Sequence, residues 1–489
     1  MLAFSGIRYH YNRYSEGQIE GCSLQLVQVV QRRGDERWIE RTDLVSDDHE
    51  RIFWAQLRAR GSFSGSGRIT CEWVRHPGQL HRFIREQDGG GINPFRARFQ
   101  VAHPLRFHSA HGNFIDEVAH YRHYRERPAT PQAADGLTIL LVGELAYNAD
   151  RVLALEERGH RLYGLWTSSP AWFKTVGPLP FGHVIDLPRD DWQHAVQRIQ
   201  PDVIYAQLNW QTVAFCHTVL RANPGIPLVF HFKEGPFICY EQGLWPTLVR
   251  VLRRSAAQIF ISAENRAWFR LALGEMLDPA RSFILDGDLP KVDWFDESWA
   301  PKLSEHDGQI HTVVTGRPLG LAPFSAIAAA GINVHLYGEQ FQQTVPNLLR
   351  EGLPSEFLHL HPAVEPAMWV RELLRYDAAW LHLYTSDNGG DVRRARWDDL
   401  NLPARLGNYV AAGLPWIMRD NGDVLVATQR LATELGVGLC FNDWYDLAAQ
   451  LRDRQLLLAK TATMRGARMQ FAFDNHVDAL IAILRQARA

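Results

Sequence analysis

Residues 137–166 read LTILLVGELAYNADRVLALEERGHRLYGLW, and this stretch decides the fold class of the larger part of the chain. The run at 137–143 is apolar over the length of a strand, residues 148–160 have helical periodicity, and RLYGLW at 161–166 is a second strand-like run. Fully apolar strands that alternate with helices are typical of a parallel sheet covered by helices on both faces. We therefore expect an α/β fold with right-handed crossovers.

The alternation of strands and helices runs along the chain in two blocks. It continues from residue 137 to about residue 290, breaks over the stretch 286–308, and restarts at residue 309. We predict two doubly wound, Rossmann-like domains, at 137–290 and 309–470. A cleft at the carboxyl ends of two such sheets is the usual place for a ligand.

The first 130 residues have a different texture. Short β-branched or aromatic segments, such as 53–63 and 95–107, lie between polar or glycine-rich turns and are typical of strands. We expect a β-rich N-terminal domain over residues 1–130, whose role the sequence does not indicate. The stretch 127–136, which contains Pro and Ala, is typical of a linker.

Composition and charge narrow the functional classes. The 489 residues carry a net charge of −2, so the charge of the whole protein does not favour nucleic acid or an anionic membrane. Five cysteines without a CxxC pair fit buried thiols in a reducing compartment better than a disulfide framework. The N-terminus does not resemble a signal peptide, and no apolar run approaches about 18 residues. We expect a cytoplasmic protein, and a peripheral membrane or protein partner stays open.

The stretch 401–417, NLPARLGNYVAAGLPWI, places a helix between a polar loop and a strand. Pro403 fits the first position of a helix, because its φ is fixed and it has no N–H to donate. The free N–H groups of that first turn and the positive end of the helix suit a pyrophosphate, and Arg405 adds a charged donor. Asn408 lies one turn further on and offers an amide oxygen to a ribose hydroxyl.

Residues 137–489 resemble the GT-B glycosyltransferases that use nucleotide sugars, in particular the group similar to glycosyltransferase family four. That group carries the motif P-x-K-x-x-E-Y-M-A-A-G-x-P, which stands here as Pro403, Arg405, Asn408, Tyr409, Ala411, Ala412, Gly413 and Pro415. Similar features are VTGR at 314–317, HLYG at 335–338 and VFHFKEG at 229–235. The segment 471–489 is similar to the last helix of the family, which crosses back to the first domain. The chain departs from the pattern at Leu400 and Asn408, where the family has Glu.

The resemblance implies the transfer of a sugar from a nucleotide diphosphate sugar to a glycan, lipid-linked or protein acceptor. It implies retention of the anomeric configuration and no metal ion or other cofactor besides the donor as co-substrate. The net charge and the shortness of the basic stretch RRARW at 393–397 lead us to expect no nucleic-acid partner. The departures at Leu400 and Asn408 leave open a catalytically degenerate binding or scaffold subunit that acts with an active transferase. A sugar-phosphate epimerase or a phosphorylase on the same fold is a third class.

Candidate site residues follow from their places at the ends of strands and helices. Arg317 follows an apolar strand, where it is expected to balance the charge on a departing diphosphate. His231 ends a strand, where it is expected to contact the acceptor or act as a base. The expected catalytic residues are His231, Glu234, Arg317 and Arg405. The resemblance places these residues around the donor: Gly316, Arg317, Gly338, His361, Asp387, Asn388, Gly389, Gly390, Pro403, Arg405 and Asn408. The residues expected on the acceptor side are Gly143, Glu144, His231 and Lys233.

Two patterns that resemble metal sites have simpler explanations. Asp286-Gly287-Asp288 lies at the exit of a predicted strand and is typical of a turn. A group of histidines in the first 130 residues, His108, His111, His120 and His123, lacks the spacing of a zinc site. We therefore expect no bound metal.

Overall fold

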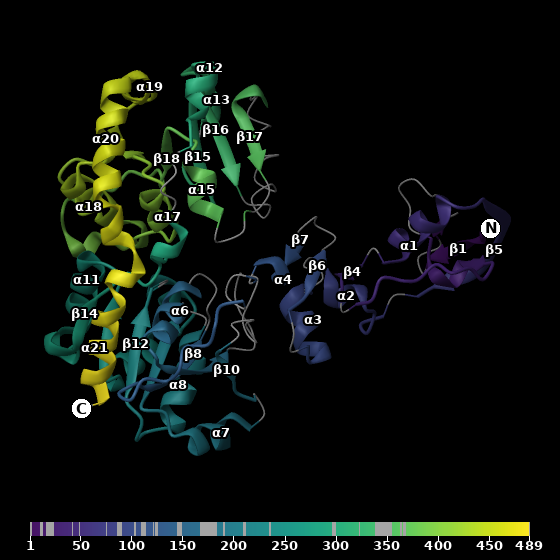
Figure 1. Cartoon of the computed structure of the whole chain (residues 1–489), viewed down its shortest axis with the longest axis horizontal. Coiled ribbons are helices and arrows are strands. Elements are labelled where there is room, and N and C mark those ends of the chain that lie inside the picture. The colour runs from purple at the N-terminus through teal and green to yellow at the C-terminus, as the bar shows by residue number, and fades with distance from the viewer. Residues whose placement is uncertain are drawn as a thin grey trace. The chain divides into compact units, whose positions relative to one another are not determined.

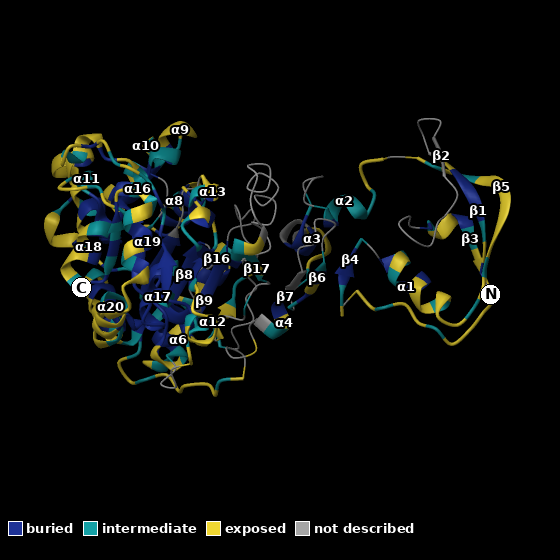
Figure 2. Ribbon diagram, turned by 90° about the horizontal axis from the view of Figure 1, so that it is seen from above, coloured by how far each residue is buried: buried dark blue, intermediate teal, exposed yellow. Residues whose placement is uncertain are grey.

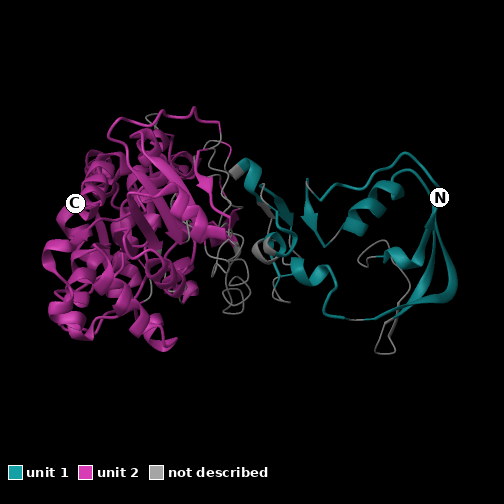
Figure 3. Cartoon of the chain, turned by 90° about the horizontal axis from the view of Figure 1, so that it is seen from below, with its two compact units in different colours: residues 1–121 teal, residues 122–489 magenta. Residues whose placement is uncertain are grey.

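The chain divides into two compact units, residues 1–121 and 122–489 (Figure 3). The first unit ends slightly before the limit at residue 130 that the sequence predicts. The computed structural model describes residues 2–9, 13–15, 24–41, 43–47, 49–74, 76–85, 90–101, 104–108, 114–120, 122, 126–143, 149–166, 183–188, 191–208, 212–233, 236–295, 300–321, 323–337, 355–361, 364 and 368–488.

The first unit holds two small sheets and several short helices. In one sheet β1 (Leu2–Tyr9) pairs antiparallel with β2 (Arg13–Ser15) and β3 (Val29–Gln31), and parallel with β5 (Phe63–Trp73). The other sheet holds β4 (Val45–Ser46), β6 (Arg106–His108) and β7 (Phe114–Asp116). The helices are α1 (His49–Arg58), α2 (His81–Ile84), α3 (Ile92–Phe99) and α4 (Glu117–His120).

The β-rich character predicted for this unit is confirmed in part. The segments 53–63 and 95–107 begin as helices rather than as strands, because α1 continues to Arg58 and α3 to Phe99. In α1 the side chains of Phe53 and Trp54 are buried in one small core with Leu2 of β1. Packing of these aromatic side chains prevails over their β-propensity, which is a weak preference.

A seven-stranded parallel sheet forms the first half of unit 2 (Figure 1). Its strand order is β10-β9-β8-β11-β12-β13-β14, and all neighbouring pairs are parallel. The order changes direction between β8 and β11, the kind of place where doubly wound sheets bind ligands. The strands are β8 (Thr138–Gly143), β9 (Arg161–Trp166), β10 (Ile185–Asp186), β11 (Val203–Leu208), β12 (Leu228–Phe232), β13 (Ala257–Phe260) and β14 (Ser282–Ile284).

A six-stranded parallel sheet forms the second half, in the order β17-β16-β15-β18-β19-β20. Here the order changes direction between β15 and β18. The strands are β15 (Ile310–Thr315), β16 (Ile332–Tyr337), β17 (Leu358–His361), β18 (Ala378–Trp380), β19 (Trp416–Arg419) and β20 (Gly438–Phe441). Two doubly wound, Rossmann-like sheets confirm the α/β fold that the apolar strands predicted.

Helices cover both sheets, and most residues of the central strands are buried (Figure 2). The first sheet is accompanied by α6 (Ala149–Glu157), α7 (Trp192–Ile199), α8 (Val213–Ala222), α9 (Pro236–Glu241), α10 (Trp245–Arg254) and α11 (Ala263–Leu273). The helices of the second half are α12 (Leu303–Asp307), α13 (Phe324–Ala329), α15 (Trp369–Leu373), α16 (Trp397–Leu400), α17 (Arg405–Ala411), α18 (Ala427–Leu435), α19 (Trp444–Arg452) and α20 (Arg454–Ala467). None of the helices in the described part of the chain is both long and apolar enough to cross a membrane.

The C-terminal helix α21 (Val477–Arg488) lies on the first sheet of unit 2, although it follows the second sheet in sequence. It contacts α6, β11 and β12 (Figure 1). Just before it, Asp474 Oδ1 accepts a hydrogen bond from the buried ammonium group of Lys291 at 2.7 Å, and Asp474 Oδ2 accepts one from the N–H of Val292 at 2.8 Å. Lys291 lies in the connection between the two sheets, so this ion pair ties the end of the chain to that connection.

Candidate functional site

Two arginines come together at the carboxyl edge of the second sheet. Gly316 directly follows β15 and has a φ of 79°, and Arg317 comes next as an exposed residue. The Nη2 group of Arg405, in the first turn of α17, donates a hydrogen bond to the carbonyl oxygen of Arg317 at 3.1 Å. The contact joins the two residues that the sequence predicted to hold a diphosphate.

Helix α17 begins at Arg405, two residues after Pro403, where the sequence predicted its start. Pro403 is buried, and its carbonyl oxygen accepts a hydrogen bond from the N–H of Leu406 at 2.9 Å, so that Pro403 belongs to the turn before the helix. The helix has seven residues. In so short a helix the aligned backbone dipoles are few, so the positive charge here comes mainly from guanidinium groups.

Two contacts hold α17 in place. The hydroxyl group of Tyr409 accepts a hydrogen bond from the N–H of Thr315 at 2.9 Å, which fixes the helix to the end of β15. A Cβ atom at Gly407 would lie 2.6 Å from Cδ of Pro290, in the connection between the two sheets. Only a residue without a side chain allows this approach, so α17 packs directly against the connection.

A histidine that sequence reasoning missed, His382, lies in the segment that packs against the loop of Arg317. His382 follows β18 and its side chain is 9% exposed. Its Nδ1 atom is 3.6 Å from Oδ1 of Asp398, and its Nε2 atom is buried without a hydrogen-bond partner. Burial lowers the pKa of His382, Asp398 opposes this, and the positive charges of Arg405 and Arg317 lower the pKa further. The sequence did contain one indication of His382, because this residue comes just after an apolar strand.

The loop after β15 explains why Arg317 and His382 are neighbours. The carbonyl oxygen of Leu319 accepts a hydrogen bond from the N–H of Leu383 at 3.1 Å, so the loop lies along the chain that leaves β18. A Cβ atom at Gly320, whose φ is 79°, would lie 1.9 Å from the carbonyl oxygen of Leu383. Glycine is therefore required for this contact.

In the first half of unit 2, His231 ends β12 as expected but is enclosed by protein. It is 2% exposed, its Nε2 atom donates to the carbonyl oxygen of Leu285 at 3.0 Å, and its Nδ1 atom accepts from the hydroxyl of Tyr205 at 2.7 Å. Burial and the charge of Arg151 hold its pKa well below the ordinary value. Both ring nitrogens are occupied, so the geometry favours a neutral histidine that joins strands over a base that faces the acceptor.

Lys233 and the Asp-Gly-Asp triplet neutralise one another. The ammonium group of Lys233 pairs with Asp288 and lies 3.7 Å from Oδ1 of Asp286. Asp288 Oδ1 is also 3.6 Å from Nη2 of Arg151. The N–H of Asp288 donates to Oδ1 of Asp286 at 3.0 Å, which closes a turn. In the part of the chain that the structure describes, no group of three His, Cys, Asp or Glu side chains has the geometry to hold a metal ion.

The loop at 385–399, expected around the donor sugar, is internally bonded. Asn388 is fully buried, and its Oδ1 atom accepts from the N–H groups of Gly390 and Leu425, at 2.8 and 3.1 Å. Its Nδ2 atom donates to the carbonyl oxygen of Leu425 at 2.7 Å. The expected sugar contact of this side chain is therefore replaced by a structural role. Asp387 is exposed beside Arg396, and Gly389 and Gly390 are exposed with φ of 60° and 79°.

The remaining predicted residues are more dispersed. The Nε2 atom of His361 is 2.8 Å from Nδ1 of His335, and its ring stacks on Tyr337 with 4.5 Å between centroids. Asn408 is half-buried on α17, and Gly143 ends β8 beside Gln207 of β11. Three predicted residues, Glu144, Glu234 and Gly338, lie outside the described residues.

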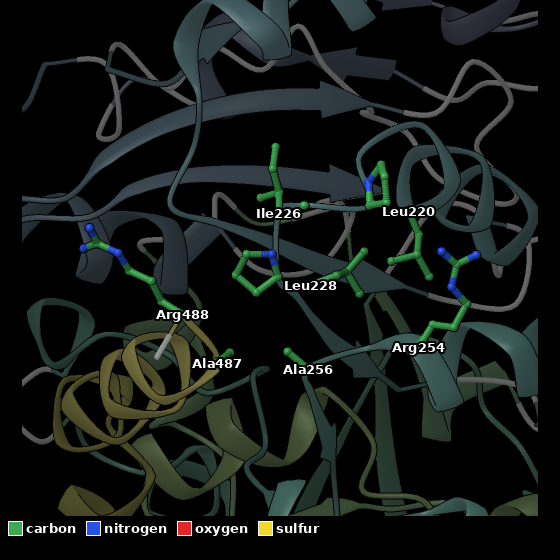
Figure 4. A pocket seen from close by; sticks show the side chains of 10 residues that line it. Leu220, Ile226, Leu228, Arg254, Ala256, Ala487 and Arg488 are labelled. Atoms are coloured by element: carbon green, nitrogen blue, oxygen red, sulfur yellow. The ribbon is translucent and has the colours of Figure 1, made fainter.

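A pocket of about 390 Å³ lies at the other edge of the first sheet (Figure 4). It opens at the amino ends of β12 and β13, beside Leu228 and Ala256, and Arg254 and Arg488 lie on opposite sides of it. Parallel sheets of this type bind ligands at their carboxyl ends. The pocket is therefore separate from the group formed by Arg317, Arg405 and His382.

Comparisons with known proteins agree with this architecture. The sequence matches no protein-family model and no curated protein. An α,α-trehalose-phosphate synthase (UDP-forming) from Burkholderia vietnamiensis is 12% identical over 72% of this chain and 100% of its own, with a TM-score of 0.50. HepE from Anabaena, solved with UDP and glucose, is 15% identical over 71% of this chain and 98% of its own, with a TM-score of 0.48. The chain has the GT-B fold that the motif at 401–417 led us to expect.

Proposed function

We propose that the protein is a glycosyltransferase that transfers a sugar from a nucleotide diphosphate sugar to an acceptor. The observation that carries the proposal is the convergence of Arg317 and Arg405 where the second sheet changes direction. Two guanidinium groups match a diphosphate in charge, and each offers paired hydrogen-bond donors to phosphate oxygens. The GT-B fold supports the same reading.

In this proposal the positive charges of Arg317 and Arg405 serve both donor binding and catalysis. The two arginines neutralise the donor diphosphate on binding. When the bond between the sugar and the diphosphate breaks, negative charge grows on the leaving group, and donors that are already oriented stabilise it. We propose retention of the anomeric configuration and no requirement for a metal ion, so that a chelator leaves the rate of transfer unchanged.

We propose a UDP-sugar as the first donor to test, because the trehalose-phosphate synthase of similar fold is named as UDP-forming. The acceptor is proposed to lie against the first sheet. A catalytically degenerate binding subunit is the second candidate. It draws support from Leu400, which stands fully buried where the family has Glu. Donor binding without turnover over a wide range of acceptors would favour it.

Calorimetric titration with UDP tests the proposal. Loss of a charge-assisted hydrogen bond reduces affinity by about tenfold or more, so we expect that loss in both Arg317→Ala and Arg405→Ala. Arg454→Ala, which changes an exposed arginine at the start of α20, is the matched control and should bind as the wild type does. If the wild type binds none of UDP, GDP and ADP, the proposed function is wrong.

A further inference from the structure

We propose that His382 accepts a hydrogen bond from a hydroxyl group of the nucleotide-sugar donor, and that this contact positions the donor against the two arginines. This inference rests on the proposed function and adds a residue that the motif at 401–417 does not contain.

His382 lies where a donor would be bound. It follows β18 by two residues, at the carboxyl edge of the sheet and next to the change of strand order between β15 and β18. The hydrogen bond between Leu383 and Leu319 brings the loop of Arg317 against the same segment. The charges of Arg317 and Arg405 both act on the imidazole ring. The proposed donor lies against all three side chains at this edge of the sheet.

The ring is oriented by its neighbours. Asp398 lies on the Nδ1 side, at 3.6 Å, and its own carbonyl oxygen accepts a hydrogen bond from the hydroxyl of Tyr384 at 2.5 Å. A carboxylate on this side favours the proton on Nδ1. The Nε2 atom on the other side of the ring then carries a lone pair and is a hydrogen-bond acceptor.

Among the described residues, none donates a hydrogen bond to Nε2 of His382. Nε2 of His382 is buried without a partner, on a side chain that is 9% exposed. A buried polar atom without a hydrogen bond is costly, and such atoms in folded proteins call for an explanation. A hydroxyl group that donates to Nε2 supplies the missing bond.

The charge of the ring decides which chemical group it meets. Burial and the two neighbouring guanidinium groups lower the pKa of His382, so the neutral form prevails near pH 7. A neutral Nε2 acceptor does not bind a phosphate oxygen, which is itself an acceptor, whereas it does bind a hydroxyl group. The two arginines are therefore matched to the diphosphate and His382 to a hydroxyl of the ribose or of the transferred sugar.

The test compares His382→Leu and His382→Gln by calorimetric titration with UDP and with UDP-glucose. Loss of one hydrogen bond to a neutral acceptor reduces affinity by about three- to tenfold, so we expect that loss in His382→Leu. We expect His382→Gln to bind nearly as the wild type does, because its amide oxygen reaches the place of Nε2. If His382→Leu binds both UDP and UDP-glucose more weakly than the wild type, the partner of His382 is a hydroxyl of the ribose. If it binds only UDP-glucose more weakly, the partner is a hydroxyl of the transferred sugar.

Thermal unfolding without ligand separates a role in binding from a structural one. His382→Leu removes an unpaired buried nitrogen, so its midpoint should equal or exceed that of the wild type. His194→Leu, which changes an exposed histidine of α7, is the control and should leave ligand binding unchanged. A lower midpoint together with no rescue by His382→Gln would overturn the inference.

The outcomes also separate this inference from the proposed function. If His382→Leu binds UDP and UDP-glucose as the wild type does while Arg405→Ala binds more weakly, the inference is wrong and the proposed function stands. If the wild type binds none of UDP, GDP and ADP and none of their nucleotide sugars, both the inference and the proposed function are wrong.

Discussion

At Gly320 the fold leaves room for a hydrogen atom and nothing larger. Its φ of 79° lies in the left-handed region, and a Cβ atom would lie 1.9 Å from the carbonyl oxygen of Leu383. The left-handed conformation alone costs a residue with a side chain about 1–2 kcal/mol. The added collision with backbone must move the loop that carries Arg317.

We predict that Gly320→Ala lowers the free energy of unfolding by about 3 kcal/mol or more, because conformational strain and the collision add. Urea denaturation measures the change. Gly308→Ala is the control, since Gly308 has a φ of 75° but nothing within 4 Å of an added Cβ atom. It should lose only about 1 kcal/mol, the strain alone. If both variants lose the same free energy of unfolding, the loop has moved and removed the collision at residue 320, and the prediction is wrong.

Individual residues show how far a sequence leads. Arg317 and Arg405 were found from their places at the end of a strand and the start of a helix, and the structure brings them together. Their role in donor binding stays a prediction. His231 was placed correctly at the end of β12, but its two hydrogen bonds to Tyr205 and Leu285 were not visible in the sequence. A side chain that can bind a ligand can equally be occupied by the protein itself.

Among the elements, three neighbouring strands of the second sheet carry a line of histidines. Nε2 of His311 donates to Asp307 at 2.9 Å, and the Nδ1 atom of His311 lies 2.9 Å from Nε2 of His335. Nδ1 of His335 in turn lies 2.8 Å from Nε2 of His361. If each ring is neutral, one of its nitrogens donates a hydrogen bond and the other accepts one, so the hydrogen bonds run in one direction from His361 to Asp307.

We predict that protonation of this line destabilises the fold in acid. Burial, helped by the neighbouring imidazoles, lowers the pKa of His335 from 6.5 to about 2. The unfolded chain therefore takes up a proton below pH 6.5 while the folded chain does not, and stability falls as the pH drops from 6.5 towards the folded value. At pH 5 this single group costs about 2 kcal/mol.

Urea unfolding of the wild type and of His335→Phe at pH 7.5 and at pH 5.0 measures this effect. The variant loses two ring hydrogen bonds and should be less stable at pH 7.5. Its stability should then fall less between the two pH values than that of the wild type. The same fall in both proteins would contradict the assignment to His335.

At the scale of the whole molecule, the two compact units have separate hydrophobic cores. Leu140, Ile204 and Phe230 belong to the core of the first sheet of unit 2, and Val314, Ile332 and Trp380 to that of the second. Among the described residues, the two small cores of the first unit are built from residues of that unit, such as Phe53 and Phe107. A unit with its own core is expected to fold alone.

We predict that residues 122–489 fold without the first unit and bind UDP with the affinity of the full chain, because the arginines and His382 lie within them. Circular dichroism with heating and calorimetric titration measure both properties. An aggregated product would show that residues 1–121 are needed for folding. A folded product that binds UDP much more weakly would show that they contribute to the donor site.

The sequence by itself determined the type of both sheets of unit 2, because apolar runs of strand length and the helical repeat between them are local patterns that burial on both faces requires. It also placed Arg317 and Arg405, since the end of a strand and the first turn of a helix are local as well. Only the tertiary structure decided which polar side chains are occupied. Asn388 bonds to a residue 37 positions away and His231 to one 54 positions away, and no local pattern reports such partners. For the same reason the unpaired Nε2 atom of His382 became visible only in the tertiary structure, which brings Asp398 to 3.6 Å from the other ring nitrogen.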